Sequence, residues 1–133
     1  MNPDSAGVEA HPGTVIGRRR GAGADAVALR RSLLLMALMV THVVLFKLSD
    51  PTERVRHETR DVLLDMQHEL PMLRSVEVGL NAGDDPRAFD VSLITRFDSM
   101  RDLLNYRVHP HHQKVIAYMK GVASQSVVVD YES

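Results

Sequence analysis

The sequence predicts an α+β domain in which four strands and three helices follow one another in the order βαββααβ. Segment 39–48, MVTHVVLFKL, is apolar on both alternating faces, and residues 51–70 carry apolar positions at helical spacing. Residues 73–97 hold two alternating strands separated by a loop rich in Gly, Asp and Pro. A βαβ crossover combined with a central hairpin is typical of a ferredoxin-like sandwich with a four-stranded antiparallel sheet.

The first strand and the first helix of this domain follow from their apolar spacing. Both faces of strand 39–48 need cover, because apolar side chains occupy both alternating sets. Asp50 and Pro51 are expected to start the helix, and Pro71 to end it. The apolar face of the helix is expected to consist of Val55, Thr59, Val62, Leu63, Met66 and Leu70.

The second half of the domain is predicted from alternation and capping signals. Strands 73–81 and 89–97 are joined by loop 82–88. Ser99 followed by Asp102 indicates a helix start, and a second helix is expected to begin at Pro110 and end near Gly121. Residues 126–131, SVVVDY, form the last strand. The apolar stripes of the two helices are predicted as Met100, Leu103, Leu104 and Val108, and as Val115, Ile116 and Met119.

A sheet with helices on one side leaves a second face that this chain has no further element to cover. Because strand 39–48 is apolar on both sides, a second copy of the chain is the economical cover for that face. We therefore expect a homodimer in which two sheets pack face to face.

The domain is expected at 36–133, preceded by a disordered extension at 1–35. Residues 1–28 are rich in Gly and Ala and lack any helical or strand period. Two alternatives stay open for this region. Arg30 and Arg31 followed by SLLLMALMV are similar to an export signal, although no small-residue cleavage site follows. Translation starting at Met36 or Met39 is the other alternative.

Composition limits the classes of partner. Residues 1–35 hold five arginines and three acids, whereas 36–133 hold eleven basic and fourteen acidic residues. The domain therefore lacks the clustered basic face that nucleic-acid binding needs. The absence of cysteine excludes disulfides and thiolate chemistry and fits a cytoplasmic location. No segment is expected to span a membrane.

Segment 106–115, YRVHPHHQKV, is the main candidate for a functional site. His112 precedes the three apolar residues of its helix by 3, 4 and 7 positions, so it is expected to point inward. In the first helical turn, the helix dipole and partial burial both favour a neutral imidazole, the state of a general base. Tyr106 could stabilise a developing enolate oxygen. It lies roughly 140° from the centre of its own stripe, however, so it is expected at a rim.

Two more histidines are candidates for the pocket. His42 shares a strand face with Val44 and Phe46 and joins His112 if that face looks toward the helices. His109 is counted among the pocket residues, with a capping or loop role as its alternative, because it precedes a proline. A metal site built from His109 and His112 lacks a carboxylate at ligand spacing. We expect neither a metal nor another cofactor.

THVVLFKL, SVEVG, FDVSLITRFDS, LLNYRVHPHHQ and SVVVDY together resemble the stress-responsive dimeric A/B barrel (Dabb) family over nearly all of 39–132. The His-Pro-x-His motif at 109–112 carries much of the likeness. The resemblance implies a ferredoxin-like monomer and a dimer whose two sheets form an α/β barrel. One relative is the plant polyketide cyclase that makes olivetolic acid by an aldol closure. Its acting tyrosine and histidine correspond to Tyr106 and His112, and another pocket histidine corresponds to His42.

The cyclase's pocket walls differ at the matching positions. Its large aromatic residues correspond to Arg60 and Leu63, its pocket tryptophan to Ala123 and a histidine on the third strand to Val91. The resemblance therefore includes the polar pair of the cyclase pocket but not the residues of its walls, and a different substrate is expected.

Three functions are compatible with this pattern. The first is a small dimeric protein whose pocket binds an apolar or aromatic metabolite without converting it. The second is a lyase or cyclase that uses His112 as base and Tyr106 as acid. The third is a purely structural dimer, in which His112 is a core histidine bonded to backbone and Tyr106 a wedge between helices.

Overall fold

The computed structural model describes residues 23–31 and 38–133, which belong to two separate units. In the first unit, residues 23–31 form a helix in which every residue is exposed. Residues 1–22 and 32–35 of the expected extension lie outside the described residues, and the disorder of the extension stays a prediction. The boundary between extension and domain at 35/36 stays a prediction.

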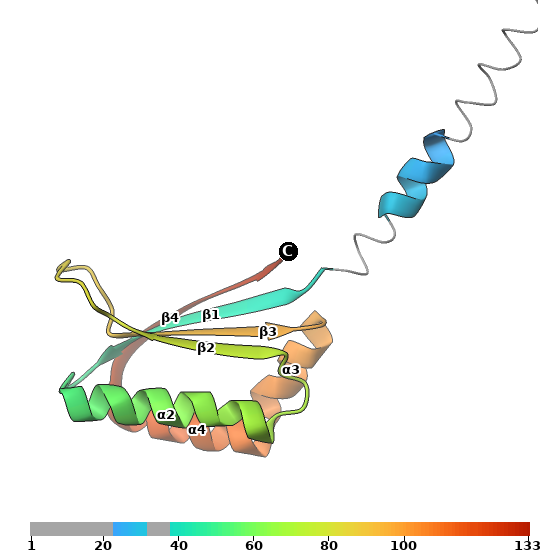
Figure 1. The fold of residues 1–133 in the computed structure, drawn as a ribbon. Helices are drawn as coiled ribbons and strands as arrows, with labels where there is room; N and C mark the ends of the chain where they lie inside the picture. The colour runs from blue at the N-terminus through green and yellow to red at the C-terminus, as the bar shows by residue number, and fades with distance from the viewer. Residues whose placement is uncertain (1–22, 32–37) are drawn as a thin grey trace, which may run out of the picture. The chain divides into compact units, whose positions relative to one another are not determined.

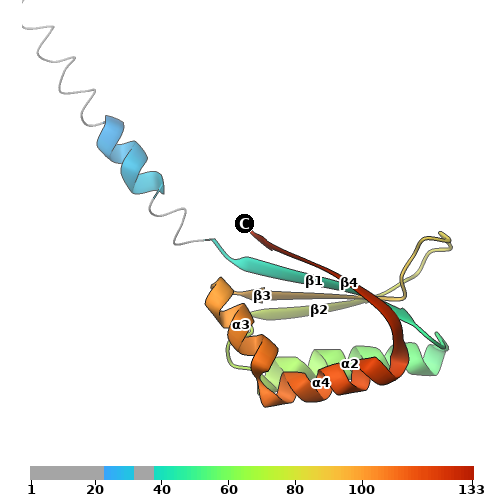
Figure 2. The ribbon, with the colours of Figure 1, turned by 180° about the vertical axis from the view of Figure 1, so that it is seen from behind.

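Four antiparallel strands form one sheet with three helices on one of its faces (Figures 1 and 2), which confirms the predicted ferredoxin-like fold. The strands follow the spatial order β2-β3-β1-β4, so β1 and β3 are central and β2 and β4 are edges. The elements are β1 (Val40–Leu48), α2 (Glu53–Glu69), β2 (Ser75–Leu80), β3 (Val91–Phe97), α3 (Met100–Val108), α4 (Pro110–Val122) and β4 (Ala123–Glu132).

The register of β1 decides which of its side chains reach the helices. His42 lies opposite Thr95 of β3 and opposite Asp130 of β4. Because side chains alternate along a strand, His42 shares the helix-covered face with Val44 and Phe46, as predicted. Phe46 and His42 are both buried on that face.

On the opposite face of the sheet, the part formed by β1 and β4 is largely apolar and is uncovered in the single chain. Val43 and Leu45 of β1 lie opposite Val129 and Val127 of β4 on this face. Leu45 is 36% exposed, Val127 43% and Val129 54%. The sheet face for which the sequence predicts no covering element is therefore accessible to solvent in the single chain.

Helix α2 begins two residues after the predicted start. Thr52, not Asp50, is the N-cap, and its hydroxyl accepts a hydrogen bond from the Val55 N–H at 3.2 Å. Thr59, Leu63 and Met66 are fully buried against the sheet, in agreement with the predicted apolar face.

The predicted apolar stripe of α3 is largely wrong. Met100 is 40% exposed, Leu104 51% and Val108 73%. The helix instead buries Leu103 and Tyr106 completely. The helix is rotated so that the Tyr106 ring packs on Phe97 of β3, with the two ring centroids 5.0 Å apart. Tyr106 is thus a core residue and not a rim residue.

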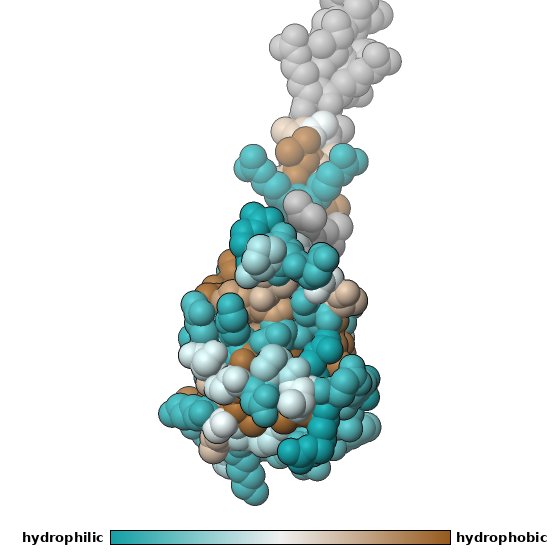
Figure 3. Space-filling view, turned by 90° about the vertical axis from the view of Figure 1, so that its left-hand side faces the viewer, coloured by the Kyte–Doolittle hydropathy of each residue, from teal (hydrophilic) through white to brown (hydrophobic). Residues whose placement is uncertain are grey.

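The β2–β3 loop is polar and exposed. Residues 81–87 are all exposed, and Asp85 pairs with Arg87 within the loop. Seen from the end of the domain that carries this loop, polar side chains predominate on the surface (Figure 3).

Candidate pocket between the sheet and helix α4

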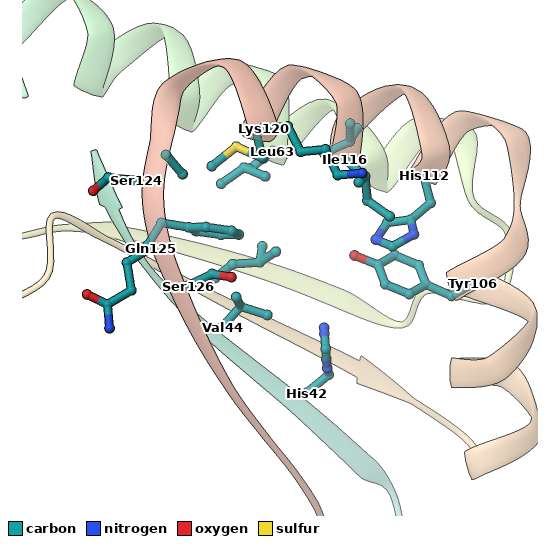
Figure 4. A pocket seen from close by; sticks show the side chains of 15 residues that line it. His42, Val44, Leu63, Tyr106, His112, Ile116, Lys120, Ser124, Gln125 and Ser126 are labelled. Atoms are coloured by element: carbon teal, nitrogen blue, oxygen red, sulfur yellow. The ribbon is translucent and has the colours of Figure 1, made fainter. Parts of the chain in front are cut away.

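A pocket of about 400 Å³ lies between β1, α4 and the start of β4 (Figure 4). This volume is within the range of small-molecule sites in proteins. Its polar lining residues are His42, Tyr106, His112, Lys120, Ser124, Gln125 and Ser126. Its apolar lining residues are Val44, Phe46, Leu63, Leu93, Val115, Ile116, Met119 and Ala123.

Three rings from three different elements meet at one end of this pocket. The centroid of Tyr106 lies 4.0 Å from that of His112 and 6.0 Å from that of His42. His42 comes from β1, Tyr106 from α3 and His112 from the first turn of α4. Because α3 ends at Val108 and α4 begins at Pro110, the chain reverses sharply enough to bring the Tyr106 and His112 rings into contact.

His112 is fixed in one tautomer by the backbone. Its Nδ1 lies 3.2 Å from the Arg107 carbonyl oxygen, which can only accept, so Nδ1 carries the proton. Nε2 is then the unprotonated ring nitrogen. Burial lowers the pKa of His112, and the nearby His42, His109 and Arg107 lower it further, against the opposing effect of the backbone hydrogen bond. The neutral ring agrees with the prediction and leaves Nε2 able to accept a proton.

Tyr106 holds its proton under all physiological conditions. Burial raises the pKa of its hydroxyl far above the ordinary value. The hydroxyl donates to the thioether sulfur of Met66 at 3.6 Å, which is a weak acceptor. A carbonyl or carboxylate oxygen in the pocket would be a stronger acceptor for the same proton.

His42 is held by a carboxylate that the sequence analysis did not identify. Its Nδ1 donates to one oxygen of Asp130, and Arg107 donates to the other oxygen at 2.9 Å. A carboxylate only accepts, so Nδ1 of His42 carries a proton. Asp130 and Arg107 were missed because their contact depends on the pairing of β4 with β1. The only signal in the sequence was the alternation within 126–131.

His109, predicted as a pocket residue, is not among the lining residues of this pocket. Its Nδ1 accepts a hydrogen bond from the His111 N–H at 3.1 Å, so its side chain caps α4. The capping alternative is the one that the structure supports. Among residues 23–31 and 38–133, no three metal-ligating side chains come together.

Only some of the positions that correspond to the cyclase's pocket walls line the pocket of this chain. Leu63 and Ala123 line the pocket, whereas Arg60 and Val91 do not. The His112 ring also makes the backbone hydrogen bond expected of a structural core histidine.

The described helices include none that is both long and apolar enough to cross a bilayer.

Comparisons with known proteins agree on one family. Residues 40–133 match the model of the stress-responsive A/B barrel domain. An uncharacterized protein of Streptomyces coelicolor is 31% identical over 97 residues, which cover 71% of this chain and 99% of the relative.

Solved structures share the fold. A dimeric protein of unknown function with a ferredoxin-like fold from Bacteroides fragilis is 27% identical, with a TM-score of 0.60 over 71% of this chain and 96% of that one. Hydroxynitrile lyase from Passiflora edulis is 19% identical, with a TM-score of 0.64 over 71% and 93%. By its sequence match and its fold, the chain belongs to the stress-responsive A/B barrel (Dabb) domain family.

Proposed function

We propose that the domain is a homodimer whose pocket binds a small molecule with an apolar or aromatic body. The observation that carries this proposal is the 400 Å³ pocket, whose interior is apolar and whose polar rings converge at one end. Sites for small molecules usually combine such an apolar lining with a few oriented polar groups.

The uncovered face of the sheet supports the dimer. Leu45, Val127 and Val129 form an apolar surface on the side of the sheet away from the pocket. A twofold copy covers such a surface without blocking the pocket. The Bacteroides fragilis neighbour is itself described as dimeric.

Pocket filling tests the binding function. Ala123 is half-buried in the lining, so Ala123→Phe would occupy part of the cavity. Ala117 is exposed on the same helix and outside the lining, and Ala117→Phe is the matched control. A thermal-shift screen of apolar and aromatic small molecules should yield compounds that raise the Tm of the wild type and of Ala117→Phe, and not of Ala123→Phe. Ligands that stabilise all three proteins equally would contradict the proposal.

A second candidate function is a lyase or cyclase reaction in the same pocket. The specific observation is the contact between a neutral His112 and a protonated Tyr106, with 4.0 Å between ring centroids. In this reaction Nε2 of His112 would remove a proton next to a substrate carbonyl, and the Tyr106 hydroxyl would donate to the enolate oxygen. Hydroxynitrile lyase from Passiflora edulis shows that a protein of this fold is a lyase.

Proton exchange separates binding from catalysis. A carbonyl compound found in the screen would be incubated with the protein in D₂O and followed by NMR. The enzyme function predicts deuterium at the carbon next to the carbonyl, lost in both His112→Gln and Tyr106→Phe. If the wild type binds the compound without deuterium exchange, the enzyme function is contradicted and only the binding function remains.

A further inference from the structure

The opening of the pocket differs chemically from its interior. Phe46, Leu63, Leu93, Val115 and Met119 are buried and form the interior. The exposed lining residues are Lys120, Ser124, Gln125 and Ser126, which we call the mouth. All four mouth residues are polar, so a ligand in this pocket would have its apolar body inside and a polar group at the mouth.

Lys120 gives the mouth a positive charge that nothing in the lining neutralises. No aspartate or glutamate is among the lining residues. Within residues 23–31 and 38–133, Lys120 takes part in no ion pair, whereas Arg107 near the other end is paired with Asp130. An unpaired ammonium beside an apolar cavity is a site for an organic anion.

The position of Lys120 on α4 orients such a ligand. Lys120 follows Ile116 by four residues and His112 by eight, so the three side chains are on one side of the helix, along the pocket (Figure 4). At 1.5 Å per residue, the backbone positions of His112 and Lys120 are about 12 Å apart. A ligand whose charged group meets the Lys120 side chain would therefore have the rest of its length along α4, in the space between the mouth and the rings of His112 and Tyr106.

The number of donors at the mouth matches one negative charge. The Ser124 hydroxyl already donates to the Lys47 carbonyl oxygen at 3.3 Å. The mouth thus offers one ammonium and the neutral groups of Gln125 and Ser126. A phosphate carries about −1.5 to −2 charges and is usually bound by several cations or by a helix N-terminus. Lys120 is in the last turn of α4, where the helix dipole is negative.

We propose that the ligand of this pocket is a carboxylate joined to an apolar or aromatic body, with the carboxylate at Lys120 and the body between α4 and β1. The inference rests on the proposed binding function, and it adds the chemical class and the orientation of the ligand.

Matched probes test the charge. The full chain would be titrated calorimetrically with 4-phenylbutanoate, with its neutral amide and with 4-phenylbutyl phosphate. We expect the carboxylate to bind about five- to tenfold more tightly than the amide, the size of a partly exposed charged contact. The preference should shrink as salt is added, because the mouth is exposed.

Variants locate the charge. Lys120→Gln should bind the carboxylate and the amide with equal affinity, whereas Lys120→Arg should keep the preference. Lys114 is exposed on the same helix and outside the lining, so Lys114→Gln is the control and should behave as wild type. A role of Lys120 limited to the helix dipole would lower the Tm without changing this selectivity.

Each of the other possible outcomes contradicts a specific part of the proposal. Equal affinity of the wild type for acid and amide, or tighter binding of the phosphate, would contradict the carboxylate class while the binding function stands. A preference that survives in Lys120→Gln and disappears in Tyr106→Phe would place the carboxylate at the wrong end. Failure of all three probes to bind at millimolar concentration, together with an empty thermal-shift screen, would remove the binding function itself.

Discussion

Nδ1 of His42 donates a hydrogen bond to the carboxylate of Asp130, joining the central strand β1 to the edge strand β4 on the pocket side of the sheet. The two residues are 88 positions apart in the chain and directly opposite each other in the strand register. The same carboxylate also accepts from Arg107 of α3. Asp130 therefore positions the imidazole at the end of the pocket where Tyr106 and His112 meet.

Replacing Asp130 with Ala should lower the free energy of unfolding by about 1–2 kcal/mol, because His42 and Arg107 lose a shared charged acceptor. Arg107→Gln should cost less than about 1 kcal/mol, since the Arg107 side chain is about half exposed to solvent. Urea denaturation measures both values. Glu132→Gln, an exposed change two residues further on the same strand face, is the control. A loss no larger than that of Glu132→Gln would show that Asp130 does not hold His42 in place.

Tyr106→Phe should change the free energy of unfolding by less than about 1 kcal/mol, because the hydroxyl donates only to a thioether. Tyr106→Ala should cost about 3–5 kcal/mol, since it leaves a cavity where a fully buried ring packed. Thermal and urea unfolding give both numbers. If Tyr106→Phe lowered the free energy of unfolding as much as Tyr106→Ala, the hydroxyl would be structural. This result would contradict a role of Tyr106 as a hydrogen-bond donor to a ligand.

Stability should decrease with acid because of His112. Its pKa in the folded protein is lowered from the ordinary 6.5, so below pH 6.5 the unfolded chain binds more protons than the folded one. The stabilisation from the neutral ring is present above 6.5 and is lost as the pH falls from there through the lower folded-state pKa. His112→Gln should flatten the pH dependence of Tm over this window, and His68→Gln, an exposed histidine on α2, should not. Parallel curves for wild type and His112→Gln would contradict the lowered pKa.

Val129→Asp should convert the proposed dimer to a monomer, because it places a charge in the uncovered apolar face of the sheet. Val128 is the matched control. It is 60% exposed on the same strand and points to the opposite face, so Val128→Asp should leave the dimer intact. Light scattering of both variants at several concentrations makes the comparison. A wild-type monomer, or dissociation by Val128→Asp alone, would overturn the interface.

Sequence periodicity predicted correctly which residues of β1 and of α4 lie together on one face. The two-sided apolar pattern of β1 placed His42, Val44 and Phe46 on a common face, and the structure has all three in the pocket lining. The spacing of His112 before Val115 and Ile116 likewise put His112 inside. Alternation fixes which residues of β1 share a face, although the sequence left open which of the two faces looks toward the helices.

Periodicity failed in α3, which has apolar residues on more than one side of the helix. In α3 the spacing of Met100, Leu104 and Val108 suggested the buried stripe, yet these side chains are exposed and the Tyr106 ring is buried. An aromatic ring buries more area than a methionine or valine and gains further by packing on Phe97. The contact between Asp130 and His42 could not be predicted for another reason. The pairing of two distant strands does not follow from the spacing of residues within either strand.

The alternation of β4 makes its alignment with β1 all-or-none. Asp130 turns toward the pocket and its neighbours Val129 and Tyr131 turn the other way. Sliding the strand by a single residue would expel the carboxylate from beside His42 and drive the Tyr131 phenol into its place, while polar Ser126 and Asp130 would appear on the apolar side. The irregular pairing between Lys47 and Leu48, where β4 starts, sets that alignment at one end. A one-residue deletion at Val127, inside the regular part of the ladder, would therefore damage the imidazole's anchor and the outer apolar surface together.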